Sequence, residues 1–380
     1  MKHSALIALT SLLTPMLLFS APRVNETSPP PPKGEMTHSI TPDYGPLPGH
    51  RADFVADAEF LWWFPNMSNT DYALKRKGVL QNSDSLTVIN PATDKEEFNW
   101  SWDPGFRFGV GVVTSHDGWD AYLNWTYFHS RASERKQVAP FTDAFQDINV
   151  GTITCTSPWF LNPHDNPYSR IRADIALNFN QVDLEKGRHF WISQNLSLRP
   201  SYGIRGYWTR INMSVKGSND LESQTVEDGT FVNEASKMKQ KSWGIGLLAG
   251  LESVWHFYSY FSVYATADIA LTYGNLKTSK HMSGTEDAGD NRFRPVSHTL
   301  HDQFYRMQPI FDLALGFRFE STLYNDAFRL LFDLGYEYHY LYDHVQFLRG
   351  TNNFSQVTDQ VAANGDLSMS GLVLRGRFEF

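Results

Sequence analysis

The clearest pattern in the chain is an alternation of bulky apolar residues with charged or small ones, most regular from Pro309 to Tyr340. From Phe311 to Phe319 the odd positions are mostly bulky and apolar, and from Phe328 to Tyr340 the even positions are Phe, Leu or Tyr. Side chains of a β-strand alternate between two faces, so this stretch predicts a long hairpin with one aromatic face and one polar face.

Similar alternation recurs along the chain. The predicted strands lie within residues 54–64, 106–112, 119–127, 171–179, 196–208, 243–255, 261–273, 311–320, 328–340 and 372–380. The gaps after the first, third, fifth, seventh and ninth strands are long, and the others are short. Outer-membrane barrels combine long outer loops with short periplasmic turns and an even strand number. We therefore predict an all-β, antiparallel transmembrane β-barrel of about 10 strands (12 if the long loops hide a further pair), with both termini in the periplasm.

The N-terminus predicts export. Lys2 and His3 precede an apolar stretch at 6–19 and the small residues Ser20 and Ala21, as in a secretory signal peptide. An uncleaved helical anchor is the alternative. We expect residues 1–21 to be the signal peptide, 22–50 a Pro-rich periplasmic leader and 51–380 the barrel. After residue 21 no run of 18 apolar residues could form a transmembrane helix.

The polar faces of the strands carry both acids and bases, and they face the lumen if the apolar faces meet lipid. The predicted lumen-facing residues are Asp57, Glu59, Arg107, Asp120, Arg172, Asp174, Arg199, Arg205, Glu252, Asp268, Asp312, Arg318, Asp333, Glu337, Arg375 and Arg377. In a wide barrel such charges line a wet channel, whereas in the narrow lumen of ten strands they could pair and plug it. The sequence leaves both states open.

Several blocks of sequence resemble the Legionella- and chlamydia-type major outer membrane proteins. They include Ala58-Glu59-Phe60-Leu61-Trp62-Trp63, His116-Asp117-Gly118-Trp119-Asp120, Asn124-Trp125-Thr126-Tyr127-Phe128-His129, Arg199-Pro200-Ser201-Tyr202-Gly203-Ile204-Arg205-Gly206 and the last two strands. The resemblance spans almost the whole mature chain and implies an outer-membrane barrel with a porin role. The chain departs from the Cys-rich chlamydial proteins, because Cys155 is its only cysteine.

The end of the chain resembles the C-terminal strand that the bacterial outer-membrane assembly machinery recognises. Phe380 and Phe378 lie on one face of that strand, with Leu374 and Leu372 behind them. The resemblance implies that Phe378 and Phe380 form the assembly signal.

Other candidate chemistry is weak. Gly244-x-Gly246-x-x-Ala249 imitates a dinucleotide-binding motif but lies inside an alternating strand. The neighbouring pairs His116-Asp117, His164-Asp165, His301-Asp302 and Asp343-His344 are not dyads by themselves, because adjacent strand residues point to opposite faces. We find no His-x-x-x-His or EF-hand pattern. We therefore predict no enzyme activity, no cofactor and no metal.

The predicted function is passive diffusion of small hydrophilic solutes through a porin-like outer-membrane barrel. One alternative is a structural or adhesive surface barrel with a closed, salt-bridged lumen. Another is an outer-membrane protease or lipase, which would need His, Asp and Ser to converge at the outer rim. The expected partners are outer-membrane lipid, the assembly machinery and small solutes, and a homo-oligomer is possible. With a net charge of −8 and no basic stripe, nucleic acid is not expected.

Overall fold

The structure, a computed structural model, describes residues 52–81, 87–114, 118–138, 152–161, 168–193, 195–218, 231–258, 260–287, 293–323, 328–351 and 359–380. The predicted signal peptide and leader lie outside these residues. The strands are β1 (Ala52–Met67), β2 (Ala73–Gln81), β3 (Thr87–Glu96), β4 (Asp103–Thr114), β5 (Trp119–Gln137), β6 (Thr152–Thr156), β7 (Arg170–Arg188), β8 (Phe190–Trp191), β9 (Leu196–Ser218), β10 (Phe231–Tyr258), β11 (Phe261–Asp287), β12 (Phe293–Leu323), β13 (Phe328–Thr351) and β14 (Asp359–Glu379). In the described part of the chain, no helix could span a membrane.

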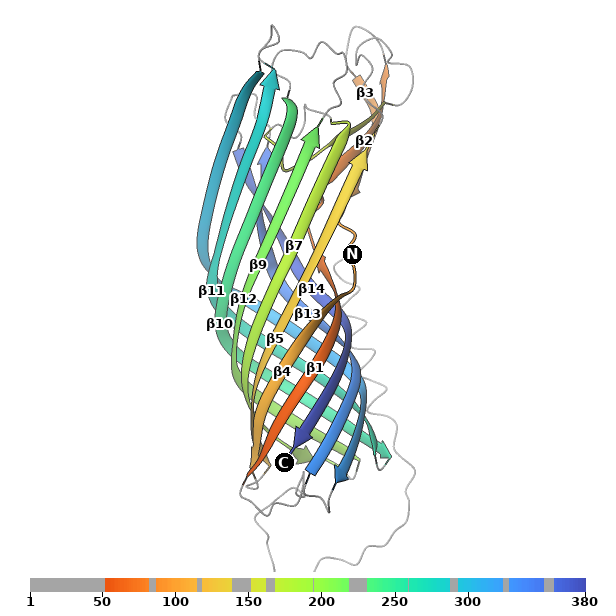
Figure 1. Ribbon diagram of the computed structural model, residues 1–380, viewed down its shortest axis with the longest axis vertical. Coiled ribbons are helices and arrows are strands. Elements are labelled where there is room, and N and C mark those ends of the chain that lie inside the picture. Colours follow the sequence, from red (N-terminus) through yellow and green to blue (C-terminus); the bar gives the residue numbers. More distant parts are fainter. Residues whose placement is uncertain are drawn as a thin grey trace, which may run out of the picture. The chain divides into compact units, whose positions relative to one another are not determined.

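Ten of these strands close into an antiparallel barrel (Figure 1). Their order is β1-β4-β5-β7-β9-β10-β11-β12-β13-β14, and β14 pairs with β1. The seam is fixed at its end by two backbone hydrogen bonds between Phe54 and Phe380, of 2.7 and 2.9 Å. The predicted antiparallel barrel of about 10 strands is thus confirmed. The long connections hold a separate three-stranded sheet, β3-β2-β6, rather than two more barrel strands.

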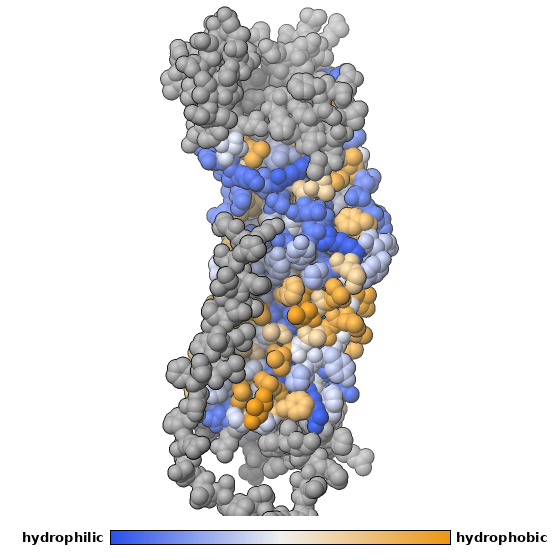
Figure 2. All heavy atoms as spheres, turned by 180° about the vertical axis from the view of Figure 1, so that it is seen from behind, coloured by the Kyte–Doolittle hydropathy of each residue, from blue (hydrophilic) through white to orange (hydrophobic). Residues whose placement is uncertain are grey.

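An apolar belt surrounds the part of the barrel nearest the C-terminus. On β10, Ile245, Leu247 and Leu251 face outward between Trp243 and Trp255, and all five are exposed. Twelve residues separate the two tryptophans, which at about 3.4 Å per residue and a tilt of about 45° gives a height of about 29 Å. The belt therefore has the thickness and the aromatic edges that a barrel presents to lipid. On the face seen in Figure 2, hydrophobic side chains gather in the middle and lower parts, and hydrophilic ones dominate above them.

Beyond the belt, in the part we call the upper barrel, the two faces exchange character. On β7 the odd residues Ile171, Ala173, Ile175, Leu177 and Phe179 are buried inside the barrel, at 0–1% exposure. The prediction that they face outward was wrong. Lipid makes an apolar outer face favourable only within the belt. Above it the outer face meets water, so the apolar residues turn inward to form a core.

The barrel wall parts above the belt between β12 and β13. The two strands pair from Leu323–Phe328 to Ile310–Leu341, and beyond that β13 pairs only with β14. At this point Asp343 adopts a positive φ of 52°, and the register of β13 against β14 shifts. Four consecutive residues of β13, 344–347, are then buried, so the strand runs into the lumen.

Candidate functional site

Most of the predicted lumen-facing residues lie inside the barrel, within the height of the apolar belt. Those inside are Asp57, Glu59, Arg107, Asp120, Arg199, Arg205, Glu252, Asp268, Asp312, Arg318, Asp333, Glu337, Arg375 and Arg377. Arg172 and Asp174 are the exceptions. Their side chains are 66% and 41% exposed, and they lie on the outer face of β7 in the upper barrel. This error has the same cause as that for Ile171–Phe179. Both predictions assumed that apolar residues face outward above the belt as they do within it.

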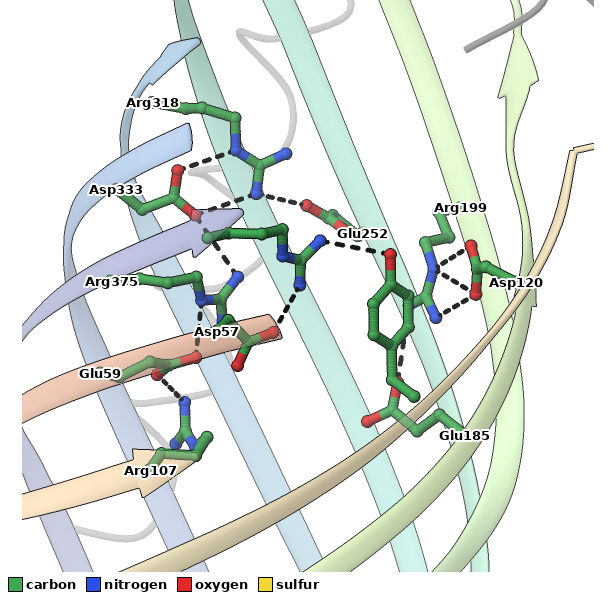
Figure 3. A network of polar contacts seen from close by, with 12 residues as sticks. Asp57, Glu59, Arg107, Asp120, Glu185, Arg199, Glu252, Arg318, Asp333 and Arg375 are labelled. Carbon is green, nitrogen blue, oxygen red and sulfur yellow. Dashed lines mark hydrogen bonds and ion pairs between the residues drawn. The ribbon is translucent and has the colours of Figure 1, made fainter. Parts of the chain in front are cut away.

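Glu59 is the centre of the first charged cluster. Its Oε2 accepts a hydrogen bond of 2.5 Å from Arg107 Nη1, and its Oε1 accepts one of 2.6 Å from Arg375 Nε. Arg375 also reaches Asp333, at 3.4 Å. Asp333 in turn accepts a bond of 2.8 Å from Arg318 Nε (Figure 3). Acids and bases therefore alternate, which offsets the cost of burying each charge.

A second cluster joins strands that are not neighbours. Arg205 of β9 donates to Asp183 of β7 at 2.8 Å and also to Asp312 of β12. His339 of β13 lies between Asp312 and Glu337, with ring nitrogens 2.9 and 3.1 Å from their carboxylate oxygens. Because β9 and β12 are separated by two strands of the barrel, the Arg205–Asp312 pair bridges the lumen.

A third cluster lies around Asp120. Arg199 Nη2 donates to Asp120 Oδ1 at 2.6 Å, and His189 Nε2 lies 3.3 Å from Asp120 Oδ2. The guanidinium groups of Arg199 and Arg377 stack on the ring of Tyr122, at 5.0 and 4.7 Å. Figure 3 shows Arg199 and Asp120 facing each other across the end of the network.

A small cavity remains between these clusters. It has a volume of about 110 Å³ and is lined by Arg205, Asp268, Asp312, Glu337 and other charged or polar residues. The cavity is large enough to hold several water molecules. Sequence reasoning missed Asp183, Glu185 and His339 as candidates. The even spacing of His339 from Asp333 and Glu337 is the signal that could have found it. Asp183 and Glu185 could not be found in this way, because the alternation on β7 predicted that its even residues lie inside.

Above the charged clusters the lumen is filled mainly by uncharged side chains, although Glu234 and Lys280 are also buried there. Trp63 is fully buried and packs on His339, Phe128 and Arg107, with ring separations of 4.5 and 5.4 Å and a cation–π distance of 5.9 Å. His344 packs on Tyr207 and bonds Thr209 at 2.7 Å and Gln308 at 3.0 Å. An apolar core follows, including Ile211, Met213, Leu341, Phe347, Leu367 and Met369.

The inward course of β13 completes this filling. Gln240 of β10 donates to the backbone oxygen of His344 and accepts from the backbone nitrogen of Gln346, both at 2.7 Å. The hydroxyl of Thr278 on β11 donates to the backbone oxygen of Gln346 at 2.8 Å. Side chains of the facing wall thus satisfy backbone groups that no neighbouring strand bonds.

The other candidate motifs do not converge. His116-Asp117 and His164-Asp165 lie outside the described residues. Asp343 pairs with Arg306 at 2.8 Å, while His344 is buried and bonds uncharged groups. Within the described ranges no group of three His, Cys, Asp or Glu residues could hold a metal. Cys155 is buried in β6, and burial raises the pKa of its thiol to about 11, which disfavours the reactive thiolate.

Comparison with known proteins gives a family and distant structural likenesses. A family model described as the Legionella pneumophila major outer membrane protein precursor matches residues 46–380. No curated protein matches the chain. The chain is similar to the outer membrane protease OmpT from Escherichia coli (12% identity, 86% of this chain and 96% of that chain, TM-score 0.39). It is also similar to the Pseudomonas putida toluene transporter TodX (8% identity, 88% and 90%, TM-score 0.30). Likenesses this distant carry no information on activity.

Proposed function

Since the chain belongs to the family of the Legionella pneumophila major outer membrane protein, a family of the bacterial outer membrane, we propose that it is a structural surface barrel closed to hydrophilic solutes. It anchors in lipid through its apolar belt and carries its upper barrel and long loops outside the cell. No catalysis is part of this proposal.

One observation carries the proposal: the lumen is bridged by side chains at two successive levels. At the lower level, Arg205 binds Asp312, and Arg107 binds Glu337 at 3.0 Å, and each pair joins strands that have two others between them in the wall. Above that level, Trp63 and the inward segment 344–347 are buried in the lumen. A hydrated solute would have to separate buried ion pairs and then displace an apolar core.

The strand number supports the same proposal. In small barrels of about eight strands, side chains fill the interior, whereas porins with an aqueous channel have 16–18 strands. This barrel has ten. Its inner face in the belt carries long arginine side chains beside small residues such as Gly109 and Gly250, and those arginine side chains have the reach to meet across a narrow lumen.

Passive diffusion of small solutes is the second candidate function. The observation that favours it is the cavity of about 110 Å³, whose lining mixes acids and bases at the height of the belt. Such a wall suits a weakly selective ion path, provided that the layers above and below can open.

Conductance distinguishes the two candidates. The purified, heat-modifiable barrel should be reconstituted in planar bilayers, and in liposomes for solute-swelling assays. The closed barrel predicts a silent bilayer and no swelling with small sugars. Regular single-channel steps that scale with the amount of folded barrel would overturn the proposal and favour diffusion. An unfolded preparation at equal concentration is the control for detergent leaks.

A further inference from the structure

A row of basic side chains faces outward just above the apolar belt. Lys241 of β10 lies directly opposite Arg210 of β9 on one side and Lys277 of β11 on the other. Lys239 and Lys237 follow on the same face of β10, and all five residues are exposed. We call Arg210, Lys237, Lys239, Lys241 and Lys277 the basic patch.

In the described part of β9–β11, the patch has no acidic neighbour on the outer face. From the belt up to the Ala235–Ser283 pair, the other outward residues of β9–β11 are polar and mostly uncharged, and they include Asn212, Ser214 and Ser279. Among the described residues, no carboxylate lies within ion-pair distance of the five basic groups. By contrast Arg172, on the outer face of β7, has Asp174 at 3.7 Å.

This arrangement is unfavourable without an anion. Like charges directly opposite each other on neighbouring strands destabilise a sheet. Arg210, Lys241 and Lys277 form three such positions in succession across β9, β10 and β11. An anion that contacts more than one of them would offset the repulsion.

The height of the patch matches that of a lipid headgroup. Trp208 and Trp243 lie opposite each other and mark the edge of the belt, together with Tyr273. Lys241 lies two positions from Trp243 along β10, which is a rise of about 5 Å at about 3.4 Å per residue and a tilt of about 45°. The short turns lie at the end of the barrel that holds the C-terminus, so this edge faces the outer leaflet.

We propose that the basic patch binds the phosphate groups of a bisphosphorylated glycolipid in the outer leaflet. The Arg210 guanidinium can donate two parallel hydrogen bonds to one phosphate, while the lysine ammonium groups act as point charges. From Lys237 to Lys241 the patch extends over about 14 Å of β10, at about 3.4 Å per residue. It can therefore contact two phosphate groups at once, which the single phosphate of a phospholipid does not offer. The site is independent of whether the lumen is open.

Lipid binding to the folded full-length barrel tests the proposal. Native mass spectrometry of the detergent-solubilised protein would use diphosphoryl lipid A, monophosphoryl lipid A and phosphatidylglycerol as probes. We expect the diphosphoryl probe to bind most tightly and to weaken at least tenfold in K241Q/K277Q. K241R/K277R, which keeps both charges, should bind as the unmodified barrel does.

The matched control removes two basic residues at the other end of the barrel. Lys186 and Arg188 of β7 lie over Trp119, so K186Q/R188Q makes the same charge change beside another aromatic residue. It should leave lipid A binding unchanged. Equal binding by K241Q/K277Q and the unmodified barrel would overturn the proposal. An equal loss of binding in K186Q/R188Q would also overturn it. Complete competition by millimolar inorganic phosphate would overturn it as well, because it would indicate a site for free anions.

Discussion

Arg375 of the last strand lies directly opposite Glu59 of the first, and its Nε is 2.6 Å from Glu59 Oε1. The barrel therefore carries a buried ion pair on the seam where it closes. A shift of β14 by one residue against β1 would turn Arg375 to the lipid face while Glu59 stayed inside, and the pair would be lost. The pair thus favours one register of closure over its neighbours.

We predict that Glu59→Gln destabilises the barrel strongly. Glu59 neutralises both Arg107 and Arg375, and its side chain is 1% exposed. Removing one partner of a buried ion pair typically costs about 3–5 kcal/mol. Because Arg107 keeps Glu337 at 3.0 Å and Arg375 keeps Asp333 at 3.4 Å, we expect the lower end of that range. Urea unfolding of the barrel in lipid vesicles would measure the loss.

The control is the ion pair between Lys136 and Glu96, whose side chains are 28% and 24% exposed. Exposed ion pairs contribute about 0–1 kcal/mol, so Glu96→Gln should change the free energy of unfolding by no more than that. Equal losses for the two variants would mean that the Glu59 cluster is hydrated rather than buried.

The period-two alternation was enough to predict ten strands, their order and most of the inner face. It worked because lipid outside and charges inside impose one parity throughout the belt, as in β12, where Leu315 faces outward and Asp312 inward. It failed on β7, because water replaces lipid above the belt and the same alternation then has the opposite meaning. The alternating sequence of residues 171–179 would look the same whether its apolar side chains faced lipid outside or a core inside.

A charge on the outer face should be costly within the belt and harmless above it. Leu315→Arg places a guanidinium against lipid, which costs about 2–4 kcal/mol near the midplane of such barrels. His301→Arg, on the same face of β12 in the upper barrel, should change stability little, because that residue is exposed above the belt. Unfolding in vesicles would compare them, and similar losses would contradict the position of the belt.

The inversion on β7 has its own test. Ile175 is buried in the upper core at 1% exposure, whereas Leu184, on the same strand, is 52% exposed in the belt. Ile175→Ala should cost about 2–5 kcal/mol, as expected for a cavity in a packed core. Leu184→Ala should cost much less, since lipid can fill the space. A larger loss for Leu184→Ala would restore the original lipid-facing assignment of Ile175.

The assembly role of the last strand stays a prediction. Phe380 stacks on Phe378, with ring centroids 5.7 Å apart, and its backbone bonds Phe54. We expect Phe380→Ala to lower the amount of folded barrel in the outer membrane while secretion to the periplasm continues. The control is Phe319→Ala, which removes an aromatic ring at the same end of the barrel but outside the last strand. Heat-modifiable mobility on gels measures the folded fraction, and normal levels in Phe380→Ala would count against the assembly signal.

Neither the inward course of β13 nor the choice of ion-pair partners could be predicted from the sequence. Residues 344–347 still alternate polar and apolar in the sequence although all four are buried, so the pattern does not reveal a strand that enters the lumen. Parity places Arg205 inside but not beside Asp312, because their contact depends on the width of the barrel and on the relative heights of β9 and β12. Those quantities follow from the register of all ten strands together.

The closed lumen makes a final prediction about Arg375 and Arg377. Arg377 lies opposite Asp57, and Arg375 opposite Glu59, so replacing both arginines with Gln leaves two buried carboxylates without those partners. In a closed barrel the variant should unfold at a lower urea concentration and remain silent in planar bilayers, because Trp63 and residues 344–347 still fill the lumen above. In a diffusion channel the same two carboxylates would attract cations and shift the reversal potential toward cation selectivity. If the unmodified barrel conducts, and the variant conducts equally well but with that shift in reversal potential, the closed lumen is contradicted.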